Sequence, residues 1–237
     1  MIVSDPAAIY YLTGKWVHPG ERMLALYLSV DGGHKLFLNQ LFSVPEDLGV
    51  EKVWFSDTDD SIRILSQYVN KSKPMGIDKN WPSHFLIRLM EQKGDSAFVN
   101  GSAIVDRIRA CKDEQERELM RQSSRLNDQA IGRLIQLVAS KLSEKKRAQL
   151  LPGIYEDLGA DGCAFDPIVA YGPNAADPHH GPDNTVLKEG DCVILDIGCK
   201  KDSYCSDMTR TVFYKYATDH ARKVYDVVFE ANKRAIE

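Results

Sequence analysis

The pattern of apolar and polar positions predicts a series of short strands and helices over the first hundred residues. Runs of aliphatic, aromatic and β-branched residues alternate there with segments whose apolar residues recur every three or four positions. This alternation favours an α/β domain with a mixed sheet. One helix is expected after a cap at Asp57 or Thr58, and another from Pro82 to a stop at Gly94. The strands are expected at residues 1–6, 23–30, 35–39, 53–56 and 74–78.

Helical spacing dominates the middle of the chain. A long helix is expected from Lys112, because its apolar residues keep to one face. A second helix has Ser143 as its cap and is broken at residues 152–153. A last helix begins at a cap at Asp219.

A chain of 237 residues is long enough for two domains of ordinary size. We place them at residues 1–108 and 109–237. Residues 102–111 are interpreted as the link between them, so the boundary is expected between Gly101 and Lys112.

The second domain is organised around a hairpin. Residues 192–198, of sequence CVILDIG, are predicted to form a buried strand, and residues 204–214, of sequence YCSDMTRTVFY, are predicted to form its return. Each strand places one aspartate, Asp196 or Asp207, among apolar or β-forming residues. A buried carboxylate needs a partner, so these two positions are candidates for chemistry.

A turn centred on Lys201 and Asp202 makes Asp196 and Asp207 direct cross-strand neighbours, with Cβ atoms about 4.5–5.5 Å apart. Like charges at that spacing destabilise a sheet, and a bridging divalent cation would resolve the conflict. Two ions held by shared carboxylates form a hydrolytic site. A register shifted by one residue is the open alternative, and it points one carboxylate to solvent.

A loop ahead of this hairpin contains two adjacent histidines. It runs from Asn174 to His180 with the sequence NAADPHH, and Pro178 keeps the chain extended before His179. Adjacent histidines in a loop are also ordinary solvent-facing residues, so this motif alone predicts little.

Composition narrows the classes of function. A content of 43% hydrophobic and 27% charged residues is typical of a globular protein, and a net charge of −4 provides no basic face for nucleic acid. The basic run at residues 141–147 is interrupted by Glu144 and is interpreted as a solvated helix start. No apolar run approaches the ~18 residues of a membrane span, and no signal peptide opens the chain, so no membrane partner is expected.

Five cysteines, an odd number without CxxC spacing, predict reduced thiols in a cytoplasmic protein. Zinc sites usually need short paired motifs, so the cysteines near the aspartates are interpreted as core or turn residues. The five are Cys111, Cys163, Cys192, Cys199 and Cys205.

The order of these motifs resembles a known family. Asp196 lies 17 positions after His179 of the NAADPHH loop, Asp207 lies 11 positions further, and Thr-Arg-Thr follows at residues 209–211. This order is similar to that of the Xaa-Pro aminopeptidases and prolidases, the pita-bread metallopeptidases of peptidase family M24. The α/β pattern of the first domain resembles the N-terminal domain of Xaa-Pro peptidases and creatinases, which methionine aminopeptidases generally lack.

The resemblance implies a metal-dependent peptidase that cleaves the bond before proline at the N-terminus of Xaa-Pro peptides. It implies that Asp196 binds one metal ion, that Asp207 bridges two, and that His179 is the catalytic histidine. The cofactors would be two divalent ions of manganese, cobalt or zinc. The partners would be proline-containing peptide substrates and a second copy of the chain in a homodimer.

In the resembled family, one further histidine and two glutamates bind the metals, well beyond the second aspartate. After Asp207 this chain offers His220, Glu230 and Glu237, which do not match those positions and are not assigned. We therefore expect a fragment with an incomplete pita-bread domain that is inactive alone. Two alternatives of the same fold stay open: a non-catalytic peptide- or protein-binding module, and a creatinase-like hydrolase without metal.

Overall fold

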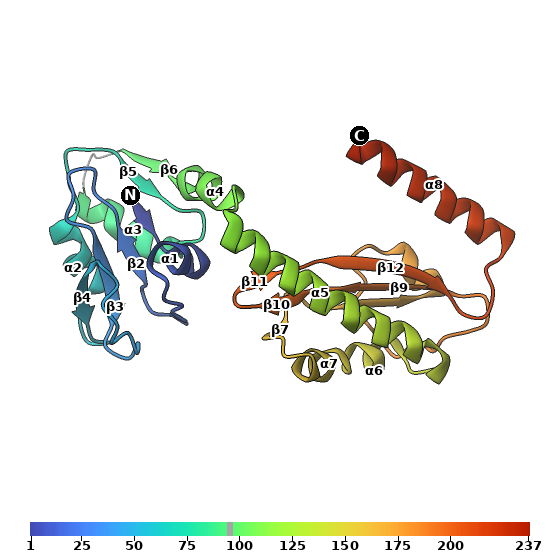
Figure 1. The fold of residues 1–237 in the computed structure, drawn as a ribbon. Coiled ribbons are helices and arrows are strands. Elements are labelled where there is room, and N and C mark those ends of the chain that lie inside the picture. Colours follow the sequence, from blue (N-terminus) through green and yellow to red (C-terminus); the bar gives the residue numbers. More distant parts are fainter. Residues whose placement is uncertain (94–96) are drawn as a thin grey trace. The chain divides into compact units, whose positions relative to one another are not determined.

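The computed structural model describes residues 1–93 and 97–237, which form two compact units, Met1–Cys111 and Lys112–Glu237. Both units combine helices with strands (Figure 1), which confirms the predicted α/β class. The predicted helix stop at Gly94 lies outside the described residues.

The first unit is built on a six-stranded mixed sheet with the strand order β4-β3-β2-β1-β5-β6 (Figure 1). β1, β2 and β3 pair antiparallel, whereas β4, β5 and β6 join parallel to their neighbours. The strands are β1 (Ile2–Val3), β2 (Ala25–Tyr27), β3 (Lys35–Asn39), β4 (Glu51–Phe55), β5 (Met75–Ile77) and β6 (Phe98–Asn100).

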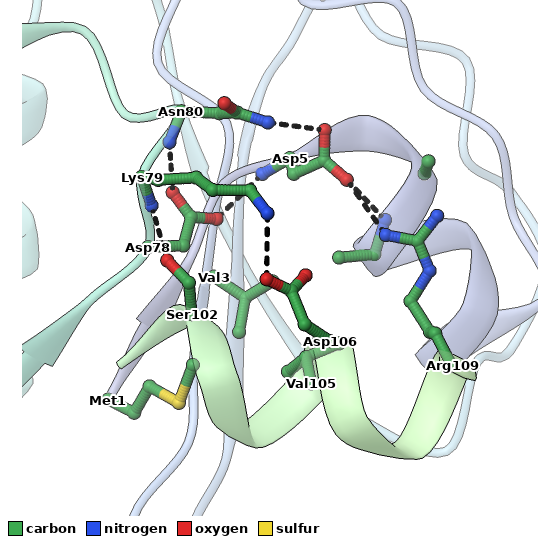
Figure 2. Close-up of a pocket in the computed structure, with 12 residues that line it drawn as sticks. Met1, Val3, Asp5, Asp78, Lys79, Asn80, Ser102, Val105, Asp106 and Arg109 are labelled. Carbon is green, nitrogen blue, oxygen red and sulfur yellow. Dashed lines mark hydrogen bonds and ion pairs between the residues drawn. The ribbon is translucent and has the colours of Figure 1, made fainter. Parts of the chain in front are cut away.

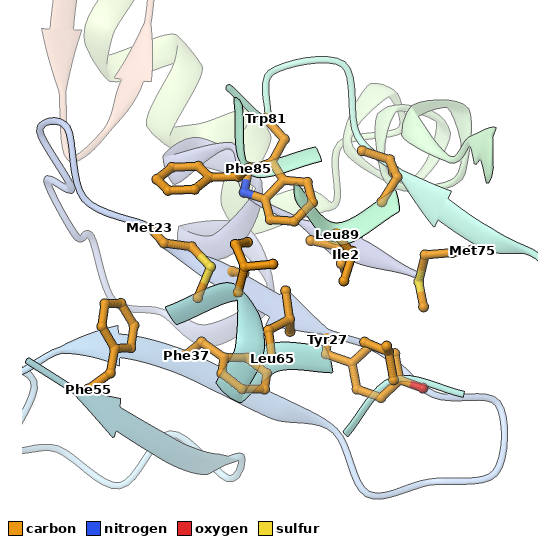
Figure 3. Packing of buried hydrophobic residues seen from close by; sticks show 14 residues of the cluster. Ile2, Met23, Tyr27, Phe37, Phe55, Leu65, Met75, Trp81, Phe85 and Leu89 are labelled. Carbon is orange, nitrogen blue, oxygen red and sulfur yellow. The ribbon is translucent and has the colours of Figure 1, made fainter. Parts of the chain in front are cut away.

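Side chains on successive strand residues divide between two hydrophobic cores, as the pleat of a strand requires. Ile2 and Phe37 belong to one core, and Val3 and Leu36 belong to the other. Figure 3 shows the first core, in which Ile2 and Phe37 lie with Leu65 of α2 and Leu89 of α3. The helices of this unit are α1 (Pro6–Thr13), α2 (Ser61–Tyr68), α3 (Ser83–Lys93) and α4 (Ser102–Ala110).

Two segments of the first unit are helices where none was expected. Residues 6–13, for which no helix was predicted, form α1, which Asp5 caps and Gly14 ends with a φ of 73°. Residues 102–110, interpreted as a link, form α4, because Val105 on this segment is buried in the second core. The cap of α2 is Asp60 rather than Asp57 or Thr58.

The second unit begins with the long helix that the spacing predicted. α5 (Glu114–Gln136) starts in a capping box, in which Asp113 and Glu116 bond each other's backbone N–H groups. Ser143 caps α6 (Glu144–Ala148), as predicted. The predicted break at residues 152–153 was wrong, because α6 already ends at Ala148. Pro152 lies instead in the first turn of α7 (Leu151–Asp157), where proline is tolerated.

The second unit also contains two three-stranded sheets, with the orders β12-β9-β8 and β11-β10-β7. Alternate residues of β9 are buried, and Val193, Leu195 and Ile197 pack in one core with Leu134 of α5 and Tyr155 of α7. The strands are β7 (Gly162–Cys163), β8 (Ile168–Tyr171), β9 (Cys192–Ile197), β10 (Cys199–Lys201), β11 (Tyr204–Cys205) and β12 (Met208–Phe213).

The predicted hairpin is present, but its register was wrong. The turn residues are Asp202 and Ser203, with φ values of 48° and 68°, so the connection has the two positive φ angles of a type I′ turn. Asp196 therefore lies opposite Thr209 and not opposite Asp207. Each arm is also interrupted, since neither Gly198 nor Asp207 belongs to a strand.

The last helix, α8 (Asp219–Ile236), is capped by Thr218 rather than by Asp219. None of its residues is buried. Among the described residues, no helix has both the length and the apolar character needed to cross a membrane.

Candidate functional site

The two aspartates lie on the two arms of the β9–β12 hairpin. Asp196 is half-buried in β9, and the hydroxyl of Thr209, its cross-strand neighbour, donates to its Oδ1 at 2.8 Å. Asp207 is exposed and directly precedes β12. Asp207 and Thr209 are two positions apart, and side chains along a strand return to the same face every second residue. A regular strand would therefore present both residues on one face.

Buried side chains of α5 hold the interrupted part of this hairpin. Asn127 Nδ2 donates to the carbonyl oxygen of Ile197 at 3.0 Å, and Ser123 Oγ donates to that of Cys199 at 2.8 Å. Tyr155 Oη in turn donates to Asn127 Oδ1 at 2.7 Å. Burial raises the pKa of Tyr155, so its hydroxyl keeps the proton that this bond requires. The main chain beside Asp196 is thus fixed by three fully buried side chains.

His179 lies on the loop between β8 and β9. Its side chain is exposed, and its backbone N–H donates to Asp177 Oδ1 at 2.9 Å. No hydrogen bond or ion pair within residues 1–93 and 97–237 joins His179 to Asp196 or Asp207. The structure therefore brings the aspartates onto one hairpin but does not show the histidine in contact with them.

Glu144, which the sequence pattern predicted to lie in a solvated run, is the best-connected carboxylate of this region. Glu144 is fully buried, and its Oε1 accepts from Tyr171 N–H at 2.7 Å and from Asn174 Nδ2 at 3.0 Å. Its Oε2 accepts from Asp183 N–H at 3.1 Å and pairs with His180 Nε2 at 2.7 Å.

The solvated interpretation of residues 141–147 is also wrong at Arg147, which is fully buried. Its Nε donates to Tyr171 Oη at 2.5 Å, and its Nη atoms reach the carbonyl oxygens of Leu134 and Val138. A signal was present in the sequence: Glu144 and Arg147 are three residues apart and therefore share one face of a helix.

Two groups of side chains are candidates for metal binding: the cluster around Glu144, and the pair Asp196 and Asp207. In the parts of the chain that the structure describes, Glu144, His180 and Asp183 are the one set of three ligating side chains within mutual reach. Each carboxylate oxygen of Glu144 already has two hydrogen-bond partners, which leaves little capacity to bind a cation. Asp196 and Asp207 offer the oxygen donors that hard divalent ions prefer, but they supply only part of a complete ligand set.

A cavity of about 240 Å³ lies in the first unit, between β1, the end of β5 and α4 (Figure 2). Its charged side chains are paired: Arg109 lies 3.4 Å from Asp5, and Lys79 lies 2.7 Å from Asp106. Asp78 accepts from neighbouring backbone N–H groups and a serine hydroxyl. We interpret this polar cluster as a brace between α4 and the sheet.

Models of known families match nearly the whole chain. The model described as metallopeptidase family M24 matches residues 118–237, and the model of the creatinase/prolidase N-terminal domain matches residues 1–111. An uncharacterized peptidase of Staphylococcus aureus (strain MRSA252) is 28% identical over 243 residues, which cover 99% of this chain and 67% of that protein.

Solved structures with the same fold include a prolidase, a dipeptidase and an X-Pro aminopeptidase. A prolidase from Thermococcus sibiricus has a TM-score of 0.87 at 28% identity, covering 99% of this chain and 66% of its own. A dipeptidase from Pyrococcus horikoshii OT3 has a TM-score of 0.84 at 29% identity, with coverages of 98% and 66%. An X-Pro aminopeptidase from Thermotoga maritima MSB8 has a TM-score of 0.77 at 26% identity, with coverages of 99% and 68%. The chain thus spans about two thirds of the length of these relatives.

Proposed function

The chain belongs to metallopeptidase family M24 and carries a creatinase/prolidase N-terminal domain, and from this membership we propose that the whole protein hydrolyses Xaa-Pro peptides at the bond before proline. The observation that carries the proposal is the hairpin that holds Asp196 in β9 and Asp207 directly before the paired strand β12. Similarity to a prolidase and to an X-Pro aminopeptidase supports the choice of substrate class.

Asp196 and Asp207 are the proposed metal ligands. Divalent ions bound in such a site activate a water and stabilise the charge that develops on the scissile carbonyl. The hydroxyl of Thr209 holds Asp196 in one orientation, as outer partners of metal ligands commonly do. The bonds from α5 to the main chain beside Asp196 add rigidity, which a preorganised site needs.

His179 is the proposed proton donor. Proline nitrogen in an Xaa-Pro bond has no hydrogen, and it must gain a proton when it leaves. An imidazole titrates near neutral pH and is suited to that transfer. The exposed ring of His179 leaves it accessible to a peptide.

The test is hydrolysis by the whole protein of Ala-Pro, Ala-Pro-Phe and Ala-Ala in the presence of Mn²⁺. We expect cleavage of one or both proline peptides and none of Ala-Ala. Asp196→Asn and Asp207→Asn should each lower kcat/KM by about 10²-fold or more, because each removes a charge from the proposed metal site. Asp202→Asn changes an exposed turn aspartate in the same way and is the matched control.

The same assay separates the alternatives. Activity that survives a chelator would indicate the metal-free, creatinase-like hydrolase. Binding of proline peptides without turnover, unchanged in Asp196→Asn, would indicate the non-catalytic module. The ratio of activities on Ala-Pro and Ala-Pro-Phe distinguishes a dipeptidase from an aminopeptidase.

A further inference from the structure

We propose that Glu144 is a positioning residue for His179: its buried carboxylate fixes the loop between β8 and β9 in the shape that presents this histidine. The inference rests on the proposed function, because that function assigns His179 its proton transfer. Glu144 itself belongs to α6, outside the loop, and it contacts neither aspartate of the hairpin in the described residues.

The four partners of the carboxylate enclose the histidine along the chain. Tyr171 and Asn174 lie before it, His180 directly follows it, and Asp183 lies beyond. The partners lie 27 to 39 residues from Glu144 in the sequence, so these tertiary bonds hold several positions of the loop against α6 at once. A single side chain thus ties residues on both sides of His179 to α6.

Backbone contacts support the same attachment. The N–H of Glu144 donates to the carbonyl of Thr185 at 3.1 Å, and that of Lys145 donates to Asp183 at 2.8 Å. Ser143 also forms an isolated β-bridge with Val186. These bonds hold residues 183–186 without the carboxylate, so the carboxylate is needed chiefly for the part from Asn174 to His180.

The four partners of Glu144 are better satisfied by a carboxylate than by an amide at position 144. All four partners present an N–H to Glu144, and a carboxylate offers acceptor sites on both oxygens. Glutamine has the same shape but presents an NH₂ group in place of one oxygen. That NH₂ group would face the backbone N–H of Tyr171 or of Asp183, so at least one contact would place donor against donor. Glu144→Asp keeps both oxygens on a stem one methylene shorter. The two variants therefore separate loss of acceptors from loss of length.

The first measurement is backbone amide exchange in residues 1–237, which needs no activity. We expect Glu144→Gln to accelerate exchange of the Tyr171 and Asp183 amides by about tenfold or more, because local opening governs their protection. Glu156→Gln, the same change at an exposed position of α7, is the control and should leave this loop unchanged. Circular dichroism shows whether Glu144→Gln folds. If it does not, Asn174→Ala replaces it as the test variant, because that change removes only one of the donors to the Glu144 carboxylate.

The second measurement is peptide hydrolysis by the whole protein. We expect Glu144→Gln to lower kcat about 10²-fold, because misplacement of a catalytic group by about 1 Å has an effect of that size. KM should stay within about twofold, and Glu144→Asp should recover part of kcat. In a His179→Ala background, Glu144→Gln should have little further effect, since the two changes act on one function.

Unchanged exchange across residues 171–185 in Glu144→Gln would overturn the proposal. So would an equal loss of kcat with and without His179, or micromolar Mn²⁺ binding that His180→Ala abolishes, which would make the cluster a metal site. If the wild-type protein cleaves no proline peptide, the proposed function fails, and the exchange data still decide whether Glu144 holds the loop.

Discussion

At the scale of single residues, Gly198 is the position of the hairpin that tolerates no side chain. A Cβ there would overlap the ring of Phe165 and lie 2.8 Å from the carbonyl oxygen of Ser206. We expect Gly198→Ala to lower the free energy of unfolding by about 1–3 kcal/mol, the usual cost of overpacking. Urea unfolding followed by circular dichroism measures this effect.

Gly132→Ala provides the matched control for that change. Gly132 lies inside α5, and a Cβ there meets no atom within 4 Å. The substitution should stabilise the chain by about 0.4–1 kcal/mol, because alanine loses less conformational entropy in a helix. Equal effects of the two variants would show that the close approach at Gly198 is absent in solution.

The five thiols should differ in reactivity with iodoacetamide. Burial raises the pKa of Cys163, Cys192 and Cys199, whereas Cys111 and Cys205 are exposed. Because a raised pKa lowers the thiolate fraction at a given pH, the first three should react at least about tenfold more slowly at pH 8. Their rates should rise as the pH increases. Peptide mass spectrometry gives the order, and labelling of Cys199 as fast as Cys111 in the folded chain would contradict it.

At the scale of elements, the turn determines the register of the hairpin. Ser203 has a φ of 68°, a conformation in which glycine avoids a steric cost of about 1–2 kcal/mol. After the greater entropy loss of glycine is subtracted, Ser203→Gly should stabilise the chain by about 0.5–1 kcal/mol. Lys201→Gly should destabilise it by a similar amount, because Lys201 pairs with Tyr204 within the ladder.

The two variants distinguish the observed register from the one that the sequence predicted. A turn centred on Lys201 and Asp202 would give the opposite order of stabilities. The comparison of their urea midpoints therefore tests whether Asp196 lies opposite Thr209.

At the scale of the whole molecule, the connection between the compact units should be the first site of proteolysis. α4 ends at Ala110 and α5 begins at Glu114, so trypsin should cut first after Lys112. Arg107 and Arg109 lie within α4 and should be cut later. Intact-mass analysis of early time points identifies the products. A first cut at Arg107 would mean that α4 does not stay folded on the first unit.

Metal binding by residues 1–237 should be weak. Asp196 and Asp207 supply two carboxylates, whereas a divalent ion in a protein usually has about six oxygen ligands, some of them water. We expect Mn²⁺ titration calorimetry to give a Kd no tighter than about 10⁻⁴–10⁻³ M and no hydrolysis of Ala-Pro. Micromolar binding at two sites, lost in Asp196→Asn, would show that other residues of the chain complete the site.

Several features of the fold could be predicted from the spacing of residues that are close together in the sequence. The α/β class, the long helix α5, the Ser143 cap and a hairpin with one aspartate on each arm all follow from neighbouring residues in the sequence. Such features depend on spacing and capping, which act over a few residues. The order of the histidine loop and the aspartates was likewise visible in sequence, although their roles stay predictions.

The tertiary structure decided the features that depend on long-range contacts. Asp196 pairs with Thr209 because the turn lies at Asp202 and Ser203. The positive φ angles of these two residues could not be predicted from the sequence, since neither is a glycine. Residues 102–110 form a helix because Val105 is buried in a hydrophobic core of the first unit. Glu144 looked like a break in a solvated basic run, yet it is buried because donors 27 to 39 residues away satisfy its charge. A buried charge is stable only with such partners, and only the folded chain brings them together.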